Sequence, residues 1–346
     1  MAGRRQHFIP RMLLRGFADG KEQVRVTHRV RGGFLASISN VALERDFFGA
    51  PGPGTVDEVV STEENKIKEI LKAVCLTKGA IDSESAATLI SHMTSRVRSI
   101  RAYMEETGRV ALAEIDRRFQ DETSMRESIL REIRKDPSSV SKELEDALQT
   151  QYGKTVLKQF KRTPAYKQML NAAMAQVEAS IMSSEFSGIA DRFRGVLATF
   201  GDSMGATVFG AHSKALLAGP TPTARVKTLS AFSYEAVECD GIVLSDSIAW
   251  CVRKGSHLAP IFTLEDDIEN IYMPVSSSIV LVGSSRGSRT EIPTANELQR
   301  AAFRVSDEFV VAHPSTNVDD ELAIEFGTSG TVAVRRMADE LRNDQR

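Results

Sequence analysis

The sequence predicts an α+β fold, a mixed sheet built from the N- and C-terminal segments and packed against a central layer of long helices. Apolar side chains alternate with polar ones near the N-terminus, recur at helical spacing through the middle, and return in short β-type runs towards the end. The segments that follow from this are 1–56 (β), 57–218 (helical) and 219–346 (α+β, completing the sheet). With 346 residues, the chain is long enough for two connected cores.

The N-terminal segment is expected to be short β structure. Residues 23–30 alternate apolar and polar side chains with period two, which is typical of a half-buried strand. Turn residues flank this run on both sides. The glycine- and proline-rich residues 49–54 are expected to be a loop.

Helix signals fill the middle segment. Ser61 and Glu64 have the spacing of a capping box, and apolar residues follow at helical intervals. Asp82 predicts the cap of a second helix that runs to about Gly108. Three further helices are expected over residues 109–134, 141–152 and 154–198, the last with a break or a new start at Pro164.

The last segment mixes strands with one helix. Residues 241–252 read as two buried strands that meet at Asp246, and residues 270–274 and 278–283 read as another strand pair. Thr294 and Glu297 form a second capping-box pattern, which predicts a helix to about Val311. Residues 331–335 are expected to be a final strand.

Composition limits the classes of partner and compartment. The formal net charge of −2 gives no general attraction to nucleic acid or anionic lipid, so a nucleic-acid or nucleotide partner requires a local basic surface. No apolar run reaches the length of a bilayer span, so no membrane association is expected. The three cysteines form no C-x-x-C pair, which favours a reducing cytoplasm over a disulfide framework.

Residues 6–17, QHFIPRMLLRGF, are the first candidate for a functional site. Large apolar side chains alternate there with His7, Arg11 and Arg15, so burial of the apolar set would direct the polar set at a ligand. An imidazole that titrates near neutrality suits a general base or a metal ligand. The alternative is a structural histidine, hydrogen-bonded within the β layer beside a bend at Pro10.

Two other residues complete the candidate set. Asp246 lies between apolar runs, where an unpartnered carboxylate is costly, so it is a candidate catalytic residue or ligand of a divalent metal. The alternative is a turn residue that accepts the backbone N–H groups of Ser247 and Ile248. Arg96, four residues after His92, is a candidate phosphate-binding residue, although most helical arginines simply face solvent.

These motifs resemble the family catalogued as domain of unknown function 4238. The shared features occur in the same order over almost the whole chain: HFIPR and LRGF at 7–17, RDFF at 45–48, an acidic helix start around Glu58 and Glu64, arginines at 96–101, LSDS at 244–247 and YMPVS at 272–276. The resemblance implies a bacterial soluble protein and assigns no reaction.

Two readings of function follow. No nucleotide-binding glycine loop, HExxH zinc motif or GxSxG elbow occurs in the chain. The first reading is a nuclease-like phosphoester hydrolase, with His7 and Asp246 as catalytic residues and Arg11, Arg15 and Arg96 binding phosphate. A divalent metal would assist it, although no residue pattern identifies the metal ligands. The second is a non-enzymatic recognition or regulatory protein in which the His-Pro-Arg motif is structural.

Overall fold

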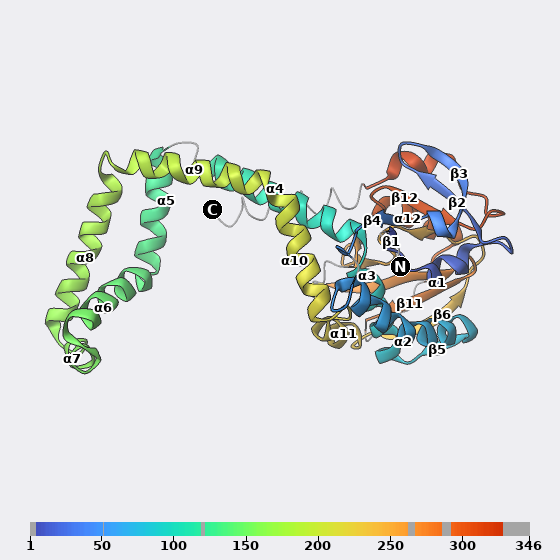
Figure 1. Cartoon of the computed structure of the whole chain (residues 1–346), viewed down its shortest axis with the longest axis horizontal. Helices are drawn as coiled ribbons and strands as arrows, with labels where there is room; N and C mark the ends of the chain where they lie inside the picture. Colours follow the sequence, from blue (N-terminus) through green and yellow to red (C-terminus); the bar gives the residue numbers. More distant parts are fainter. Residues whose placement is uncertain (1–4, 51, 119–121, 262–266, 286–291, 328–346) are drawn as a thin grey trace. The chain divides into compact units, whose positions relative to one another are not determined.

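A computed structural model of the chain describes residues 5–50, 52–118, 122–261, 267–285 and 292–327. The chain divides into two compact units. Unit 1 contains residues 1–107 and 205–346, and unit 2 contains residues 108–204. Figure 1 colours both along the sequence. The predicted segment boundaries at 56/57 and 218/219 both fall inside unit 1.

The α+β class is confirmed, and segments from both ends of the chain share one sheet of unit 1. This four-stranded sheet has the order β3-β2-β12-β7. Its strands are β2 (Gln23–His28), β3 (Gly32–Ser37), β7 (Leu244–Ser245) and β12 (Phe309–Ala312). All of its pairings are antiparallel rather than mixed: β2 and β3 form a hairpin, and β12 runs antiparallel to both β2 and β7.

A six-stranded sheet of unit 1 has the order β5-β6-β11-β10-β8-β9. Its strands are β5 (Gly79–Ile81), β6 (Ser233–Glu238), β8 (Trp250–Arg253), β9 (His257–Pro260), β10 (Ile268–Ser276) and β11 (Ile279–Ser284). The β10–β11 hairpin confirms the strand pair expected around 270–283. The two strands expected around Asp246 exist as β7 and β8 but belong to different sheets.

Short elements carry the N-terminal motif. β1 (Arg5–His7) pairs with β4 (Leu43–Arg45), and α1 (Arg11–Leu14) follows at Pro10. A 3-10 turn, η1 (Arg15–Phe17), completes the motif. A second 3-10 turn, η2 (Ile38–Asn40), precedes β4.

Two of the three predicted helix caps are found in unit 1. They are α2 (Val56–Leu76), α3 (Ser83–Ser95), α11 (Thr223–Leu229) and α12 (Ala295–Val305), followed by the 3-10 helix η3 (Asp320–Glu325). The Asp82 cap and the Thr294/Glu297 capping box are confirmed. The capping box at Ser61 and Glu64 is wrong: α2 begins at Val56, so both residues lie inside the helix. The strand expected at 331–335 lies outside the described residues.

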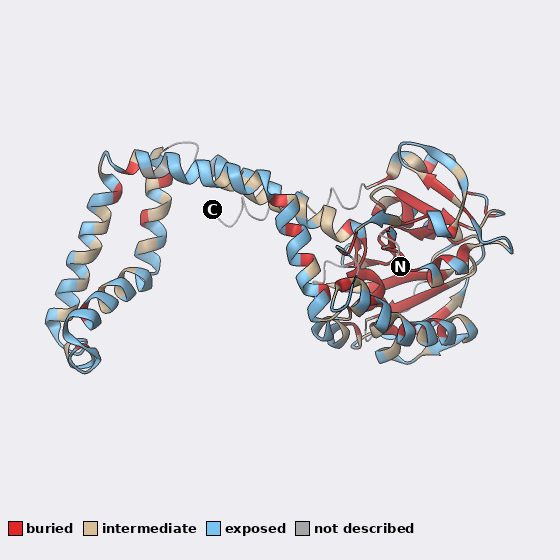
Figure 2. Cartoon of the chain, viewed as in Figure 1, coloured by how far each residue is buried: buried red, intermediate tan, exposed pale blue. Residues whose placement is uncertain are grey.

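Unit 1 has two buried apolar clusters. The larger one joins the N-terminal motif to α2, α3 and the six-stranded sheet, and it includes Ile9, Leu13, Leu14 and Phe17. The smaller one lies around Trp250, between α12 and the sheets. Figure 2 shows these buried positions concentrated in unit 1. Full burial of each large side chain contributes about 1.5–3 kcal/mol, enough to hold the N-terminal segment in place.

Unit 2 is helical in all the residues that the structure describes as regular. α4 (Arg98–Arg118) leads into it, and α5 (Glu122–Lys135), α6 (Ser138–Tyr152), α7 (Lys154–Phe160), α8 (Pro164–Met182) and α9 (Phe186–Asp202) follow. α10 (Met204–Ala218) leads out of it. Its core is small, built around Met125, Leu130, Ile181 and Phe186.

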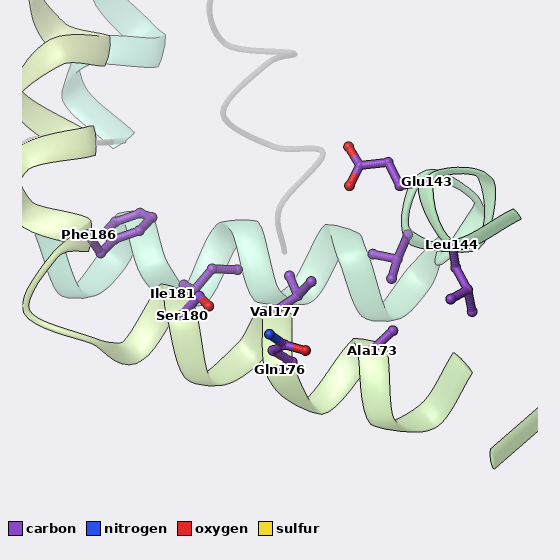
Figure 3. A pocket seen from close by; sticks show the side chains of 9 residues that line it. Glu143, Leu144, Ala173, Gln176, Val177, Ser180, Ile181 and Phe186 are labelled. Carbon is purple, nitrogen blue, oxygen red and sulfur yellow. The ribbon is translucent and has the colours of Figure 1, made fainter. Parts of the chain in front are cut away.

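One groove of about 460 Å³ lies in unit 2 (Figure 3). Most of its lining is apolar and comes from α6, α8 and the start of α9. Three polar side chains border it, and Glu143 is its one titratable group. This groove therefore offers no acid–base pair. All of the candidate site residues that the sequence predicts lie in unit 1.

Candidate functional site

The N-terminal motif is fixed in place by packing on both sides of Pro10. Leu13, Leu14 and Phe17 are completely buried. Gly16 lies so close to β10 that an added Cβ would be 2.5 Å from the carbonyl oxygen of Val275. This glycine is required by close approach, and its own carbonyl accepts the N–H of Ser277 at 2.9 Å. The backbone next to His7 is therefore held in one position.

Arg96 joins three segments at the side of His7. Its guanidinium pairs with the Glu64 carboxylate, donates from Nη2 to the His7 carbonyl oxygen at 2.6 Å, and lies 5.3 Å from the Phe48 ring centre. Arg96 is only 3% exposed, whereas the Glu64 side chain is 30% exposed. Breaking such a buried pair costs about 3–5 kcal/mol, so this contact locks α2, the end of α3 and β1 together.

The His7 imidazole is half-buried and neutral at physiological pH. Burial lowers its pKa, a backbone hydrogen bond with Val41 opposes this, and the cations Arg11 and Arg96 lower it further. Nδ1 has no hydrogen-bond partner among the described residues, so we assign the interaction with the Val41 backbone to Nε2. With this assignment the proton lies on Nε2, and Nδ1 keeps its lone pair.

The charge of Arg96 also shifts the pKa values of two further groups, Asp57 and His92. Burial raises the pKa of Asp57, in the first turn of α2, and Glu64 adds to the rise while Arg96 opposes it. Burial and then the charge of Arg96 lower the pKa of His92 to about 3. Among the described residues, Nε2 of His92 and Nε of Arg96 also lack a hydrogen-bond partner. His7, Asp57, Glu64, His92 and Arg96 are here called the Arg96 cluster.

The RDFF segment is bound to the same region through backbone atoms. The Gln6 side chain accepts the Phe48 N–H at 2.6 Å and donates to the Gly49 carbonyl oxygen at 3.2 Å. Arg101 donates to the Phe47 carbonyl oxygen at 2.9 Å, and its guanidinium carbon lies 4.0 Å from the Phe47 ring centre. The C-terminal half of this segment is thus held by side chains of β1 and α4.

Arg11 and Arg15 lie on the surface beside each other. Arg11 Nη2 is 3.4 Å and Arg15 Nε 3.1 Å from the carboxylate of Glu22, and both arginine side chains are about half exposed. Surface ion pairs of this kind contribute about 0–1 kcal/mol, so a more strongly binding anion can replace Glu22. The predicted role of these arginines in phosphate binding stays a prediction.

Asp246 is 4% exposed and holds the turn before β12. Its carboxylate accepts the backbone N–H groups of Asp307, Glu308 and Phe309 at 3.0, 2.7 and 3.2 Å. The donors lie 61–63 residues further along the chain, whereas local turn chemistry predicts Ser247 and Ile248 as the donors. Burial raises the pKa of Asp246 to about 7, and the three N–H groups oppose that rise.

Buried serines surround this carboxylate. Ser245 and Ser306 share a hydrogen bond of 3.0 Å, and the Ser247 hydroxyl donates to the Val305 carbonyl oxygen at 2.8 Å while its oxygen lies 3.1 Å from the Ser99 hydroxyl. They hold Ile248 at φ 66°, a conformation that is strained for a β-branched residue. The role of Asp246 in catalysis or metal binding stays a prediction, because both of its oxygens already accept backbone hydrogen bonds.

The structure brings the segments of His7 and Asp246 next to each other. The Phe8 ring, adjacent to His7, lies 6.2 Å from the ring of Phe309, whose N–H binds Asp246. Arg98 spans the same junction, 2.6 Å from the Glu308 carboxylate and 3.8 Å from that of Glu44 in β4. The two side chains themselves bind different partners, His7 in the Arg96 cluster and Asp246 in the turn.

Asp57 is the carboxylate of this cluster that sequence reasoning missed. Glu64 was a candidate site carboxylate, but its capping-box position gave it another explanation. The available signal was their spacing: seven residues separate them on one helix, so they share a face two turns apart. Val60, Ile67 and Leu71 lie on the same side of α2 and are buried, so the two carboxylates belong to the buried side of the helix.

Acid is expected to destabilise unit 1 through its buried histidines. Burial lowers the pKa of His212 to about 4, and that ring accepts a hydrogen bond from Arg101 and donates to the Ser95 carbonyl oxygen. Below about pH 6, the unfolded chain protonates this ring while the folded chain does not. Each such histidine then costs about 1.4 kcal/mol of unfolding free energy per pH unit. Asp246, with its raised pKa, acts in the opposite direction.

A single variant isolates this effect. Urea unfolding between pH 6 and pH 5 is expected to depend on pH less steeply in His212→Gln, by about 1.4 kcal/mol per pH unit. The control is His257→Gln, which removes an exposed histidine and is expected to keep the wild-type slope. Equal slopes in wild type and His212→Gln would contradict the buried, neutral state of His212.

The described residues contain neither a cluster of metal ligands nor a membrane-spanning helix. No three His, Cys, Asp or Glu side chains among them are placed to hold one metal ion. No described helix has both the length and the apolar character needed to cross a bilayer. The three cysteines are free thiols.

Comparison with known proteins places this architecture in a family. The model of the family described as "Protein of unknown function (DUF4238)" matches residues 5–196, which include β1, the RDFF segment, α2 and Arg96. Neither the curated proteins nor the solved structures contain a match. Because the matched region covers more than half of the chain, the protein belongs to the DUF4238 family.

Proposed function

We propose that the protein is a phosphoester hydrolase whose centre is the Arg96 cluster. The observation that carries the proposal is the set of free nitrogen atoms around one guanidinium: Nδ1 of His7, Nε2 of His92 and Nε of Arg96. Buried polar atoms are nearly always hydrogen-bonded, and those that are not commonly mark a ligand or a catalytic role. A phosphoryl oxygen would accept the free N–H of Arg96, while the lone pair on Nδ1 of His7 is left to accept a proton.

His7 is the general base in this proposal. Its neutral imidazole takes a proton from a water molecule through Nδ1 as the water oxygen attacks phosphorus. The free Nε–H of Arg96 donates to a phosphoryl oxygen, where negative charge increases in the transition state. Asp57, whose pKa is raised by burial, is assigned as the group that carries a proton to the leaving oxygen as the P–O bond breaks. The charges and protons of the step therefore balance.

The substrates that fit this proposal are nucleic acids or nucleotides of the cytoplasm. Arg11 is close enough to shift the pKa of His7, so its guanidinium is placed to contact a phosphate bound at the cluster. Arg15 shares the Glu22 partner of Arg11 and is assigned to a neighbouring phosphate. Asp246 acts in this proposal by holding the turn that supports Phe8.

Hydrolysis assays with one matched control test the proposal. Purified protein is incubated with single-stranded DNA, duplex DNA, RNA and nucleotides, with and without Mg²⁺ or Mn²⁺. We expect His7→Gln to lower kcat about 100-fold or more while the melting temperature changes little, because removing a general base removes a factor of about 10²–10⁴. His257→Gln, at an exposed strand position, is expected to retain wild-type activity. A wild-type protein that cleaves none of these substrates would overturn the proposal.

A recognition or regulatory role is the second candidate, and one observation favours it. Both Nη atoms of Arg96 and both oxygens of Asp246 contact this chain itself, so the motif residues also build the fold. In that case His7→Gln would lower the melting temperature by several degrees without an activity to lose. The same pair of measurements therefore distinguishes the two functions.

A further inference from the structure

Unit 2 contains a long segment without any acidic residue. Between Asp146 and Glu178 lie five lysines and arginines and no Asp or Glu, in a chain whose formal net charge is −2. The five are Lys154, Lys158, Lys161, Arg162 and Lys167. Residues 147–177, here called the basic segment, span the end of α6, all of α7 and most of α8.

Four of the five cations have no carboxylate partner among the residues that the structure describes. Lys161 is the exception, with its Nζ 2.7 Å from Glu145, which Tyr166 also contacts at 2.7 Å. Lys154, Lys158, Arg162 and Lys167 are exposed and form no ion pair within the described part of the chain. Lys154 and Lys158 are four residues apart on α7, so the two like charges share a face and repel each other. An anionic partner removes this repulsion.

An aromatic side chain adjoins these charges. Tyr152, at the end of α6, is 56% exposed and precedes Lys154 by two residues. α6 contacts both α7 and α8, which holds the tyrosine and the cations on one group of helices. Exposed aromatic rings beside cations are typical of surfaces on which nucleic-acid bases stack while lysine and arginine neutralise phosphates.

We infer that the basic segment is a nucleic-acid binding surface that contacts the phosphate backbone through Lys154, Lys158, Arg162 and Lys167, with Tyr152 as a stacking position. The inference is independent of the proposed hydrolase, because all of these residues lie in unit 2 and binding requires no reaction. The chain as a whole is slightly acidic, so binding of nucleic acid requires a local basic surface, and the basic segment provides one.

Fluorescence anisotropy of the full chain with labelled single-stranded DNA, RNA and duplex DNA in EDTA tests this surface. We expect the triple variant Lys154→Ala, Lys158→Ala, Arg162→Ala to bind at least about tenfold more weakly at low salt. The slope of log affinity against log salt should fall by about 2–3, since three phosphate contacts are lost. Tyr152→Ala is expected to weaken binding to single strands more than to duplex.

A triple variant at other exposed cations of unit 2 is the matched control. Arg131→Ala, Lys135→Ala, Arg192→Ala removes the same charge from exposed positions of α5 and α9 and is expected to keep wild-type affinity. Equal loss in both triples, or no binding by wild type at 50 mM salt, would overturn the inference. Competition by poly-glutamate at the same charge concentration as DNA would overturn it as well, in favour of an acidic protein partner.

Discussion

Replacing Asp246 by alanine is expected to lower the melting temperature by about 6–12 °C. The change leaves the backbone N–H groups of Asp307, Glu308 and Phe309 without their acceptor in a buried turn. Losses of this kind cost about 1–3 kcal/mol for each buried group, and we expect about 3 kcal/mol after the turn relaxes. One kcal/mol corresponds to about 2–4 °C for a protein of this size. Thermal unfolding followed by circular dichroism measures the shift.

Two further variants show whether the loss of stability comes from the Asp246 carboxylate. Asp246→Asn keeps one oxygen acceptor and is expected to lose about half as much stability. Asp240→Ala removes an exposed aspartate between β6 and β7 and should melt within about 1 °C of wild type. If Asp246→Ala also melts within about 2 °C of wild type, the carboxylate does not hold the turn, and its assignment to a catalytic or metal site regains weight.

Replacing Arg96 by methionine is expected to cost about 3 kcal/mol of unfolding free energy. The variant leaves Glu64 without its partner and the His7 carbonyl without its donor, and it removes the cation from the Phe48 ring. Arg96→Lys should recover only part of the loss, because one ammonium group cannot reproduce a guanidinium bound at two separate nitrogens. Urea unfolding gives both values.

Arg98 supplies the control two residues away. It also pairs with two carboxylates, but its side chain is 47% exposed, so Arg98→Met is expected to cost no more than about 1 kcal/mol. A double-mutant cycle with Glu64→Gln should show a coupling of about 1–3 kcal/mol for Arg96. A coupling near zero would show that α2 and Arg96 do not act together.

Local signals in the sequence predicted local structure well. The β10–β11 hairpin and the Asp82 and Thr294 caps all follow from residues within one turn of each other. The capping-box pattern at Ser61 failed for a physical reason. A serine followed by glutamate at i+3 also suits the exposed side of a helix interior, and α2 had already begun at Val56.

The candidate site was harder to predict, because it depends on segments that are distant in sequence. His7 and Arg96 were recognised as chemically informative, but their direct contact requires β1 to lie against the end of α3, 89 residues later. Glu64 acquires its partner only through that same packing. For Asp246 the sequence indicated a costly buried carboxylate, whereas its three donors come from a turn that only the pairing of β7 with β12 brings close.

For the basic segment, the sequence reveals the charges but not their partners. Its charge is visible in the sequence, although the overall net charge conceals it. Only the folded structure shows that Lys161, alone among the five, has a carboxylate partner in the described chain. Burial and ion pairing, rather than composition, separate a neutralised surface from an available one.

The most direct test of the proposed site is a titration of the histidine rings with phosphate, followed by nuclear magnetic resonance. Protein with isotope-labelled histidine is titrated with inorganic phosphate and with a dinucleotide, and His7→Gln identifies the His7 signal. The account predicts a saturable shift of the His7 ring signal, while the exposed ring of His257 stays unchanged. A His7 signal that does not respond to either compound, although the protein remains folded, would contradict a phosphate site in the Arg96 cluster.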